Sequence, residues 1–410
     1  MQNISRPIPL NQASLMFPLA LVLFEFSVYI GNDLIQPAML AITKDFAVSS
    51  SWAPSSMSFY LLGGACVAWL LGPLSDRLGR KKVLLWGVIF FALTCLLILL
   101  TTQIESFLAL RFLQGFGLSV ISAIGYAAIQ EIFDERDAIK VMALMANVSL
   151  LAPLLGPVLG AFMIDYVSWH WGFIAIAALT MISWIGLKIN MPEIKLRSTQ
   201  QPLSEIGNDF KQVFNNKRFL AFTLALPLVS MPLMLWIALS PVMLVEYFGL
   251  SSVQYGLAQF PVLGGLILGN LVLFKIIDRL PLGQTIVIGL PLMLLGTIII
   301  MAGLIWQHYF ILCLIVGMTL ISFGEGMSFS VLYRFALMSS NVSKGTVAAA
   351  ISVLLMMSFF IFLELGRILY EIFHLWSYSL MCFIFIALWF TWPRRAVQNL
   401  MQQRQQQGQF

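Results

Sequence analysis

Residues 52–103 read WAPSSMSFYLLGGACVAWLLG, then PLSDRLGRKK, then VLLWGVIFFALTCLLILLTTQ. Two long apolar runs, 52–72 and 83–103, therefore flank a short basic loop. A helix of about 20 apolar residues, rising about 1.5 Å per residue, crosses the roughly 30 Å hydrocarbon layer of a bilayer. This stretch predicts a pair of membrane-spanning helices joined by a tight connection.

The composition of the whole chain agrees with this interpretation. Of its 410 residues, 60% are hydrophobic and only 10% are charged, whereas soluble domains carry about 25% charged residues. The mean hydropathy is +0.91. A soluble domain, a disordered chain, collagen and a coiled coil are all excluded, because each needs a polar, Gly-periodic or charge-rich sequence. We predict an all-α integral membrane protein.

Twelve hydrophobic stretches are long enough to span a bilayer. They lie at about 15–41, 52–72, 83–103, 106–130, 139–165, 169–189, 218–243, 254–276, 284–304, 308–333, 345–368 and 376–393. With a cytoplasmic N-terminus, 20 of the 23 Lys and Arg residues fall in the inner loops and tails, which is the usual bias of bacterial membrane proteins. Both termini are therefore expected in the cytoplasm. The net charge of +5 reflects this asymmetry and does not indicate a nucleic-acid partner.

The longest polar stretch separates the first six predicted spans from the last six. We expect an N-terminal six-helix bundle at 1–189, a cytoplasmic linker at 190–217, a C-terminal six-helix bundle at 218–393 and a cytoplasmic tail at 394–410. The linker could form an amphipathic helix on the inner leaflet or remain solvated. The tail ends in the low-complexity sequence MQQRQQQGQF, for which we expect disorder.

The first span carries two acids where lipid would disfavour them. Glu25, Tyr29 and Asp33 are four residues apart, so they share one helix face, with about 12 Å of rise between the acids. A carboxylate at the bilayer centre costs about 2.5–3.5 kcal/mol on insertion scales, so both acids are expected to face a polar interior. Pro37 has no N–H, which predicts a kink and an unpaired Asp33 carbonyl.

Other polar residues in the spans are weaker candidates. Arg111 is expected at roughly the depth of Asp33, where it could pair with that acid or brace neighbouring helices. Glu131, Glu325 and Arg334 lie near predicted span ends, where surface exposure is the ordinary interpretation. The four cysteines and three histidines show no metal-ligand spacing, so no metal site is expected.

Three motifs resemble those of the major facilitator superfamily. The first is the loop Gly72-Pro-Leu-Ser-Asp76-Arg77-Leu-Gly79-Arg80-Lys81-Lys82, similar to G-x-L-x-D-R-x-G-R-K. The second is Arg111-Phe-Leu-Gln114-Gly115-Phe-Gly117, similar to a buried-arginine motif. The third is Ala152-Pro153-Leu-Leu-Gly156-Pro157-Val-Leu-Gly160-Ala161, similar to an antiporter motif. Ala152 and Ala161 replace the usual glycines of the third motif. A fainter copy of the first loop, Asp278-Arg279 followed by Gly283, indicates a duplicated six-helix half.

The first span narrows the resemblance. The sequence from Glu25 to Pro37 is similar to the first helix of MdfA-type proton-coupled multidrug exporters, and so are 52–64, 125–131, 143–148 and 343–349. The resemblance implies the major facilitator fold, with 12 transmembrane helices in two pseudo-symmetric six-helix bundles. It also implies a monomer in a bacterial inner membrane that exchanges protons for lipophilic neutral, chloramphenicol-like or cationic drugs by alternating access, without a cofactor.

The resemblance also assigns roles to residues, which we state as expectations. Proton coupling is expected at Glu25, Asp33 and Arg111, and drug contact at Tyr29, Asn32, Met57, Met145 and Trp236. Gating is expected at Asp76, Arg77, Arg80, Gly156 and Pro157, with smaller contributions from Glu131 and Arg334. The ordinary alternative for the methionines and Trp236 is packing or lipid contact, because the chain has 21 Met and 11 Trp.

Three other functions fit the sequence to different degrees. A proton- or solute-coupled importer or facilitator of a small metabolite could use the same fold, and the sequence leaves it open. An intramembrane enzyme is disfavoured, because no nucleophile, base and orienting group recur at helical spacing. An ATP-driven pump is disfavoured as well, because the chain contains no GxxxxGK[ST] loop.

Overall fold

A computed structural model describes residues 3–4, 10, 14–194, 203–277, 279–281, 283–340 and 342–406. These residues are almost entirely helical, apart from a two-residue parallel pair between β1 (Asn3–Ile4) and β2 (Glu193–Ile194). Within the described chain, eleven helices are long and apolar enough to cross a membrane, and a shorter apolar segment, Leu151–Tyr166, lies within α7. The prediction of an all-helical membrane protein is confirmed.

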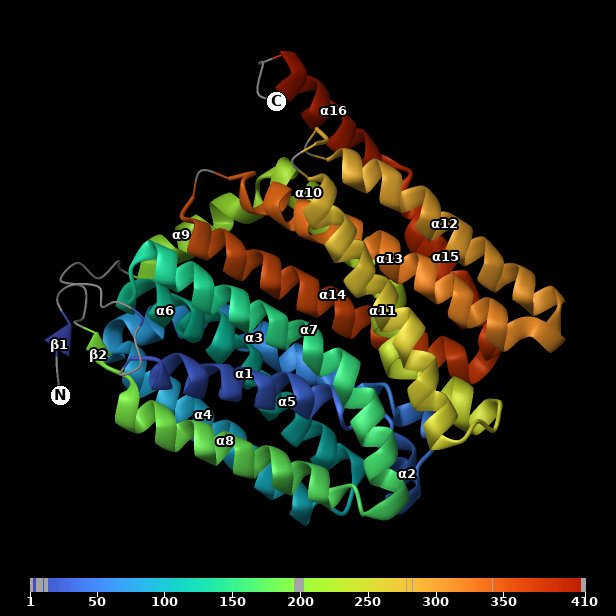
Figure 1. The fold of residues 1–410 in the computed structure, drawn as a ribbon, viewed down its shortest axis with the longest axis horizontal. Helices are drawn as coiled ribbons and strands as arrows, with labels where there is room; N and C mark the ends of the chain where they lie inside the picture. Colours follow the sequence, from blue (N-terminus) through green and yellow to red (C-terminus); the bar gives the residue numbers. More distant parts are fainter. Residues whose placement is uncertain are drawn as a thin grey trace. The chain divides into compact units, whose positions relative to one another are not determined.

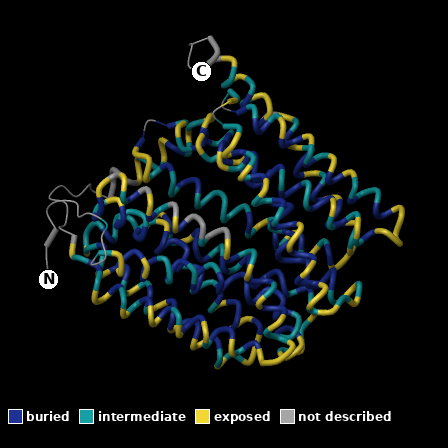
Figure 2. The backbone as a smooth tube through the Cα atoms, in the orientation of Figure 1, coloured by how far each residue is buried: buried dark blue, intermediate teal, exposed yellow. Residues whose placement is uncertain are grey.

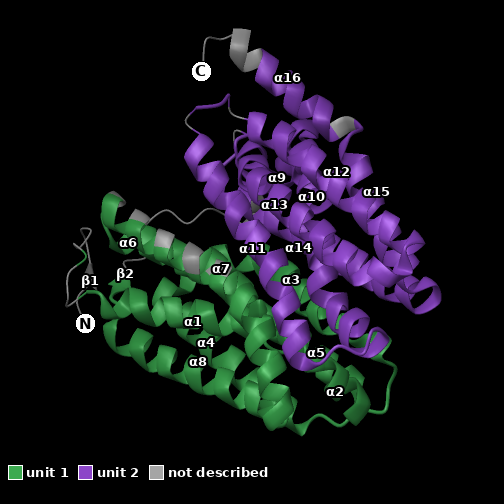
Figure 3. Ribbon diagram, turned by 45° about the vertical axis from the view of Figure 1, so that its right-hand side comes forward, with its two compact units in different colours: residues 1–203 green, residues 204–410 purple. Residues whose placement is uncertain are grey.

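The packing of the chain divides it into two compact units, Met1–Leu203 and Ser204–Phe410 (Figure 3). The first unit contains α1 (Met16–Asp33), α2 (Met39–Asp45), α3 (Ser55–Leu78), α4 (Arg80–Leu97), α5 (Ile104–Val120), the π-helical turn η3 (Ile121–Gly125), α6 (Tyr126–Ile132), α7 (Glu135–Tyr166) and α8 (His170–Asn190). The second contains α9 (Leu203–Phe214), α10 (Lys217–Ser240), the π-helical turn η4 (Pro241–Tyr247), α11 (Ser252–Ile276), α12 (Gln284–Ile305), α13 (Phe310–Leu337), α14 (Lys344–Phe373), α15 (Leu375–Trp389) and α16 (Trp392–Gln406).

Polar caps and glycines mark where several helices start. Asp134 and Asn216 accept backbone N–H bonds at the first turns of α7 and α10, and Ser251 forms a reciprocal capping box with Gln254 at α11. Such caps satisfy N–H groups that the first turn cannot pair internally. Between α3 and α4 only Gly79 is non-helical, with a φ of +97° that favours glycine. Most residues of the expected basic loop therefore lie in the last turns of α3 and the first turn of α4.

The first span is shorter than predicted. We expected it over 15–41, but α1 ends at Asp33, and the chain turns before α2 begins at Met39. Pro37 accounts for the break, because it cannot donate a helical hydrogen bond. The predicted unpaired carbonyl is wrong: the Asp33 oxygen accepts the Gln36 N–H at 3.4 Å.

The C-terminal tail also differs from the prediction. We expected disorder over its glutamine-rich end, but α16 continues to Gln406, and residues 407–410 lie outside the described chain. Glutamine and arginine have good helix propensity, so low complexity did not preclude a helix here. Residues 195–202 of the expected linker are likewise outside the described residues.

Among the eleven candidate spans, the share of buried residues is highest in α1 for the first unit and in α10 for the second (Figures 1 and 2). Within the first unit, α1 packs against α7 and α8. Large apolar side chains are instead exposed on other helices, including Ile189 and Phe274. Extensive apolar exposure is typical of a surface that contacts lipid. The two acids of α1 are thus carried by an inner helix of their unit.

Candidate functional site

Both acids of α1 are withdrawn from the surface. Glu25 has no exposed surface and Asp33 is 4% exposed, while Tyr29 between them is partly exposed. In a membrane-spanning helix, buried carboxyl groups need hydrogen-bond donors or charge partners. The structure gives the two acids different partners.

Glu25 is bonded to a tyrosine. Its Oε1 accepts a hydrogen bond from the Tyr126 hydroxyl at 3.0 Å. Tyr126 is the first residue of α6 and directly follows the π-helical turn η3, an irregularity often found at functional sites. Tyr126 was not among the residues expected from the sequence, although it lies in a stretch noted for its resemblance.

Arg111 on α5 is fully buried and connects three helices. Its guanidinium donates to four acceptors: Ser56 Oγ at 3.0 Å, the Gly31 carbonyl at 3.2 Å, Gln114 Oε1 at 2.7 Å and Asn32 Oδ1 at 3.1 Å. It also lies 4.5 Å from the centroid of the Tyr60 ring, a favourable cation–π position. Arg111 therefore acts as a brace between α1, α3 and α5.

Asn32 separates Arg111 from Asp33. Its Oδ1 accepts from Arg111, and its Nδ2 donates to Asp33 Oδ1 at 3.0 Å. None of the ion pairs among the described residues joins Arg111 to Asp33. The direct ion pair between Arg111 and Asp33 that the sequence suggested is therefore replaced by two hydrogen bonds that run through the Asn32 amide. We call this arrangement the relay.

Gly156 holds α7 against Asp33. A Cβ at Gly156 would lie 2.6 Å from the Asp33 Cβ and 2.9 Å from its carbonyl carbon, closer than real side-chain atoms approach. Gly160, one turn later, faces the backbone of Leu34 and the Pro37 ring. Gly156, which was expected to gate, and Gly160 of the same motif therefore pack directly on the break that follows Asp33, and Pro157 is buried beside them.

A second polar cluster lies where α3, α4 and α6 end or begin. Arg80 contacts Asp76 at 2.5 Å and Glu131 at 3.0 Å, and it donates to Ser75 Oγ. Arg77 is partly exposed in the last turn of α3. Glu131, for which surface exposure was the ordinary expectation, is partly exposed: 24% of its side chain is exposed, and the side chain accepts hydrogen bonds from two nitrogens of Arg80.

The position expected for Glu325, near a span end, is wrong. It lies in the middle of α13 and is 5% exposed, and its Oε2 has no hydrogen-bond partner among the described residues. Close packing surrounds it: a Cβ on Gly324 would meet Met293 of α12, and one on Gly326 would meet Leu266 of α11. The glycines on both sides of Glu325 are the feature of the sequence that could have indicated close helix packing around this acid.

We expect Glu325→Gln to change the free energy of unfolding by no more than about 1 kcal/mol, because the amide has the same shape as the carboxyl group and no charged partner is lost. Glu325→Lys should instead destabilise by about 2.5–3.5 kcal/mol or prevent insertion, because it places an unpaired ammonium in the span. Thermal unfolding in detergent measures both. A large loss of stability in the glutamine variant would mean that the ionised carboxylate itself stabilises the protein.

The remaining candidates are distributed over both units. In the first unit, Met57 is buried directly after Ser56 on α3, and Met145 is buried on α7. In the second, Trp236 is fully buried and donates to Gln259 Oε1 at 2.7 Å. Arg334 is exposed in the last turn of α13.

Two further expectations concern the second copy of the loop and metal binding. Asp278, part of the fainter loop copy, lies outside the described residues. Among the described residues, no group of three or more His, Cys, Asp or Glu is arranged to hold a metal ion.

Comparisons with known proteins identify the family of the chain. The family model described as Major Facilitator Superfamily matches residues 21–363. The chain is 74% identical over 395 residues to the chloramphenicol resistance protein CraA of Acinetobacter baumannii, with 96% of each chain covered. It is 47% identical over 369 residues to the multidrug transporter MdfA of Edwardsiella ictaluri, with 90% of each covered.

A solved structure supports the fold independently. The D-xylose-proton symporter matches with a TM-score of 0.72 over 92% of this chain and 97% of its own, at 15% sequence identity. That identity supports the fold alone. Since the family model covers most of the chain and the relatives match nearly end to end, the chain belongs to the major facilitator superfamily and is a multi-pass membrane transporter.

Proposed function

We propose that this chain is a proton-coupled antiporter that exports lipophilic neutral, chloramphenicol-like and cationic drugs across a bacterial inner membrane by alternating access. The observation that carries the proposal is the burial of two carboxyl groups, Glu25 and Asp33, on one membrane-spanning helix. Relatives named for chloramphenicol resistance and multidrug transport support the substrate class. A monomer with both termini in the cytoplasm and no cofactor is sufficient for this activity.

The two acids serve as proton carriers in this proposal. An ionised carboxylate inside the membrane is costly unless donors or cations stabilise it. Glu25 has the Tyr126 hydroxyl, and Asp33 has Asn32 with Arg111 behind it. If drug binds best when an acid is deprotonated, drug and proton each weaken the other's binding by the same factor. The membrane potential supplies about 2.3 kcal/mol per charge per 100 mV for inward proton movement.

Asn32 offers a means of coupling. Both ends of its amide are engaged, one by Arg111 and the other by Asp33. A drug that takes a hydrogen bond from Asn32 must therefore weaken the relay and change the affinity of Asp33 for a proton. Tyr29, Met57, Met145 and Trp236 would supply flexible and aromatic contacts that suit chemically varied drugs.

The decisive test is drug-induced proton release from detergent-solubilised protein near neutral pH. Wild type should release protons when chloramphenicol is added, because the loaded site favours deprotonated acids. Glu25→Gln with Asp33→Asn should abolish that release. The matched control is Glu105→Gln, which neutralises an exposed acid in the first turn of α5 and should leave release unchanged.

Two results would contradict the proposal. Wild-type protein that binds drug without releasing protons is not an antiporter of this kind. Unchanged release from the double variant would remove both acids from the coupling. An importer is distinguished in cells, where it would raise intracellular drug, whereas the exporter should lower it.

Arg80→Lys should reduce transport several-fold while the protein stays folded. Lysine keeps the charge but cannot bond Asp76, Glu131 and Ser75 together as the planar guanidinium does. Drug transport by reconstituted protein measures the effect. Lys82→Gln removes a charge from the same connection at an exposed position and should change transport little. Equal effects of the two variants would indicate that only the charge of the loop matters.

A further inference from the structure

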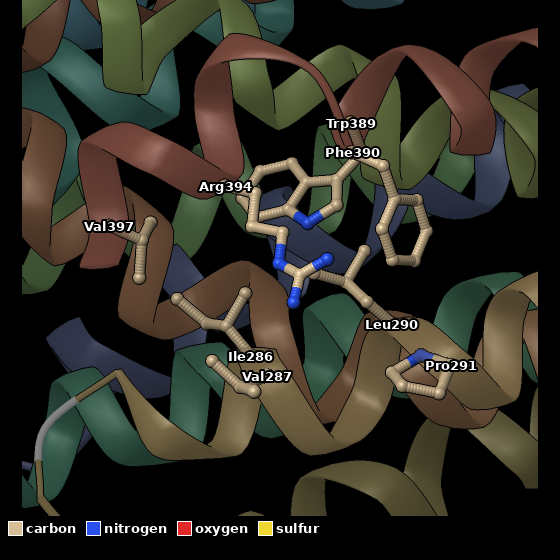
Figure 4. A pocket seen from close by; sticks show the side chains of 8 residues that line it. All are labelled: Ile286, Val287, Leu290, Pro291, Trp389, Phe390, Arg394 and Val397. Carbon is tan, nitrogen blue, oxygen red and sulfur yellow. The ribbon is translucent and has the colours of Figure 1, made fainter.

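A recess of about 100 Å³ lies in the second unit, away from the acids of α1 (Figure 4). It is formed where α12 begins, where α15 ends and where α16 follows. The side chains that line it are Ile286, Val287, Leu290, Pro291, Trp389, Phe390, Arg394 and Val397. Six of these eight are apolar, and the other two carry nitrogen donors.

The two donors face a common space. Trp389 has no exposed surface, yet its indole N–H has no acceptor among the described residues. The Arg394 guanidinium lies beside it and 5.6 Å from the Phe390 ring centroid, and Figure 4 shows the nitrogens of both side chains turned toward the recess. Two donors cannot pair with each other. A buried donor left unpaired is costly, so the recess calls for an acceptor, and the arginine favours a negative one.

The expected position of the recess in the membrane indicates which class of ligand it binds. The first turns of α12 and the last turn of α15 line it. From the distribution of Lys and Arg, these helix ends are expected on the cytoplasmic side. The cytoplasmic leaflet carries anionic lipids, and aromatic side chains commonly lie at this level. Apolar walls formed by Ile286, Leu290 and Val397 suit the upper acyl chain of such a lipid.

We propose that this recess binds the phosphate group of an anionic phospholipid. Arg394 and the Trp389 N–H donate to the phosphate oxygens, and the apolar walls cover the start of an acyl chain. Arg394 is matched to the phosphate by its planar donors. The recess shares no residue with the proposed proton and drug sites.

The test is native mass spectrometry of the purified full-length protein titrated with phosphatidylglycerol. Arg394→Ala and Trp389→Phe should each weaken the binding of the most tightly held lipid about tenfold, by removing one charge-assisted hydrogen bond. Arg395→Ala, a neighbouring exposed arginine that does not line the recess, should bind as wild type does. Drug binding is measured alongside, to verify that each variant is folded.

Each other outcome overturns the proposal in a different way. Binding within twofold of wild type in both Arg394→Ala and Trp389→Phe would place the lipid elsewhere. Equal retention of phosphatidylcholine would show an apolar recess without charge recognition. Equal binding of inorganic phosphate would show a site for a soluble anion, and an equal loss in Arg395→Ala would reduce the effect to general surface charge.

Discussion

Arg111→Lys is expected to lower drug-induced proton release at least about tenfold and to lower the free energy of unfolding by about 1–3 kcal/mol. Lysine presents one nitrogen where arginine presents a fork, so it cannot reach acceptors on α1, α3 and α5 together. At least two interhelical hydrogen bonds would be lost, and each contributes about 0.6–1.7 kcal/mol in membrane proteins. Unfolding in detergent and proton release measure the two effects on the same samples.

Ser56→Ala is the matched control for this prediction. It removes only the 3.0 Å bond to Arg111 Nε and leaves the contact with Asn32 in place. Its effect on stability should be about 0.6 kcal/mol, with nearly normal proton release. A lysine variant as active as wild type would show that a positive charge alone is enough. The fixed geometry of the relay to Asp33 would then be irrelevant to coupling.

The fold and the two acids could be predicted because their signals are local. Apolar runs long enough for a bilayer mark the spans, and an acid within such a run must be withdrawn from lipid. Glu25 and Asp33 are buried as that reasoning requires. Pro37 indicated a break near Asp33, although the helix ends there and does not merely bend.

The partners of these acids could not be predicted, because they depend on how separate helices meet. Nothing in the order of residues indicates that Asn32 lies between Arg111 and Asp33, or that Tyr126 bonds Glu25. Glu325 was misplaced for a simpler reason. The predicted span ended at 333, but α13 continues to Leu337, which puts the acid in the middle of the helix.

The contact between α7 and Asp33 leads to the second large prediction. Gly156→Val should abolish drug-induced proton release while the protein still inserts and purifies. A Cβ there meets the Asp33 Cβ at 2.6 Å and its carbonyl carbon at 2.9 Å, and backbone atoms cannot move aside as a flexible side chain would. Overpacking of this kind costs about 1–3 kcal/mol. Gly156→Ala should show an intermediate effect on release and on the unfolding temperature.

A control and a double variant separate the local effect from general misfolding. Gly264→Ala places a methyl group on α11 where no heavy atom lies within 4 Å, so it should leave both measurements unchanged. If alanine at position 156 acts by displacing Asp33 from Asn32, Gly156→Ala combined with Asp33→Asn should release no fewer protons than Asp33→Asn alone, since coupled sites are not additive. Clearly less release from the double variant than from Asp33→Asn alone would show that Gly156 acts through another contact. The close approach of α7 would then serve the movement of that helix and not the position of the acid.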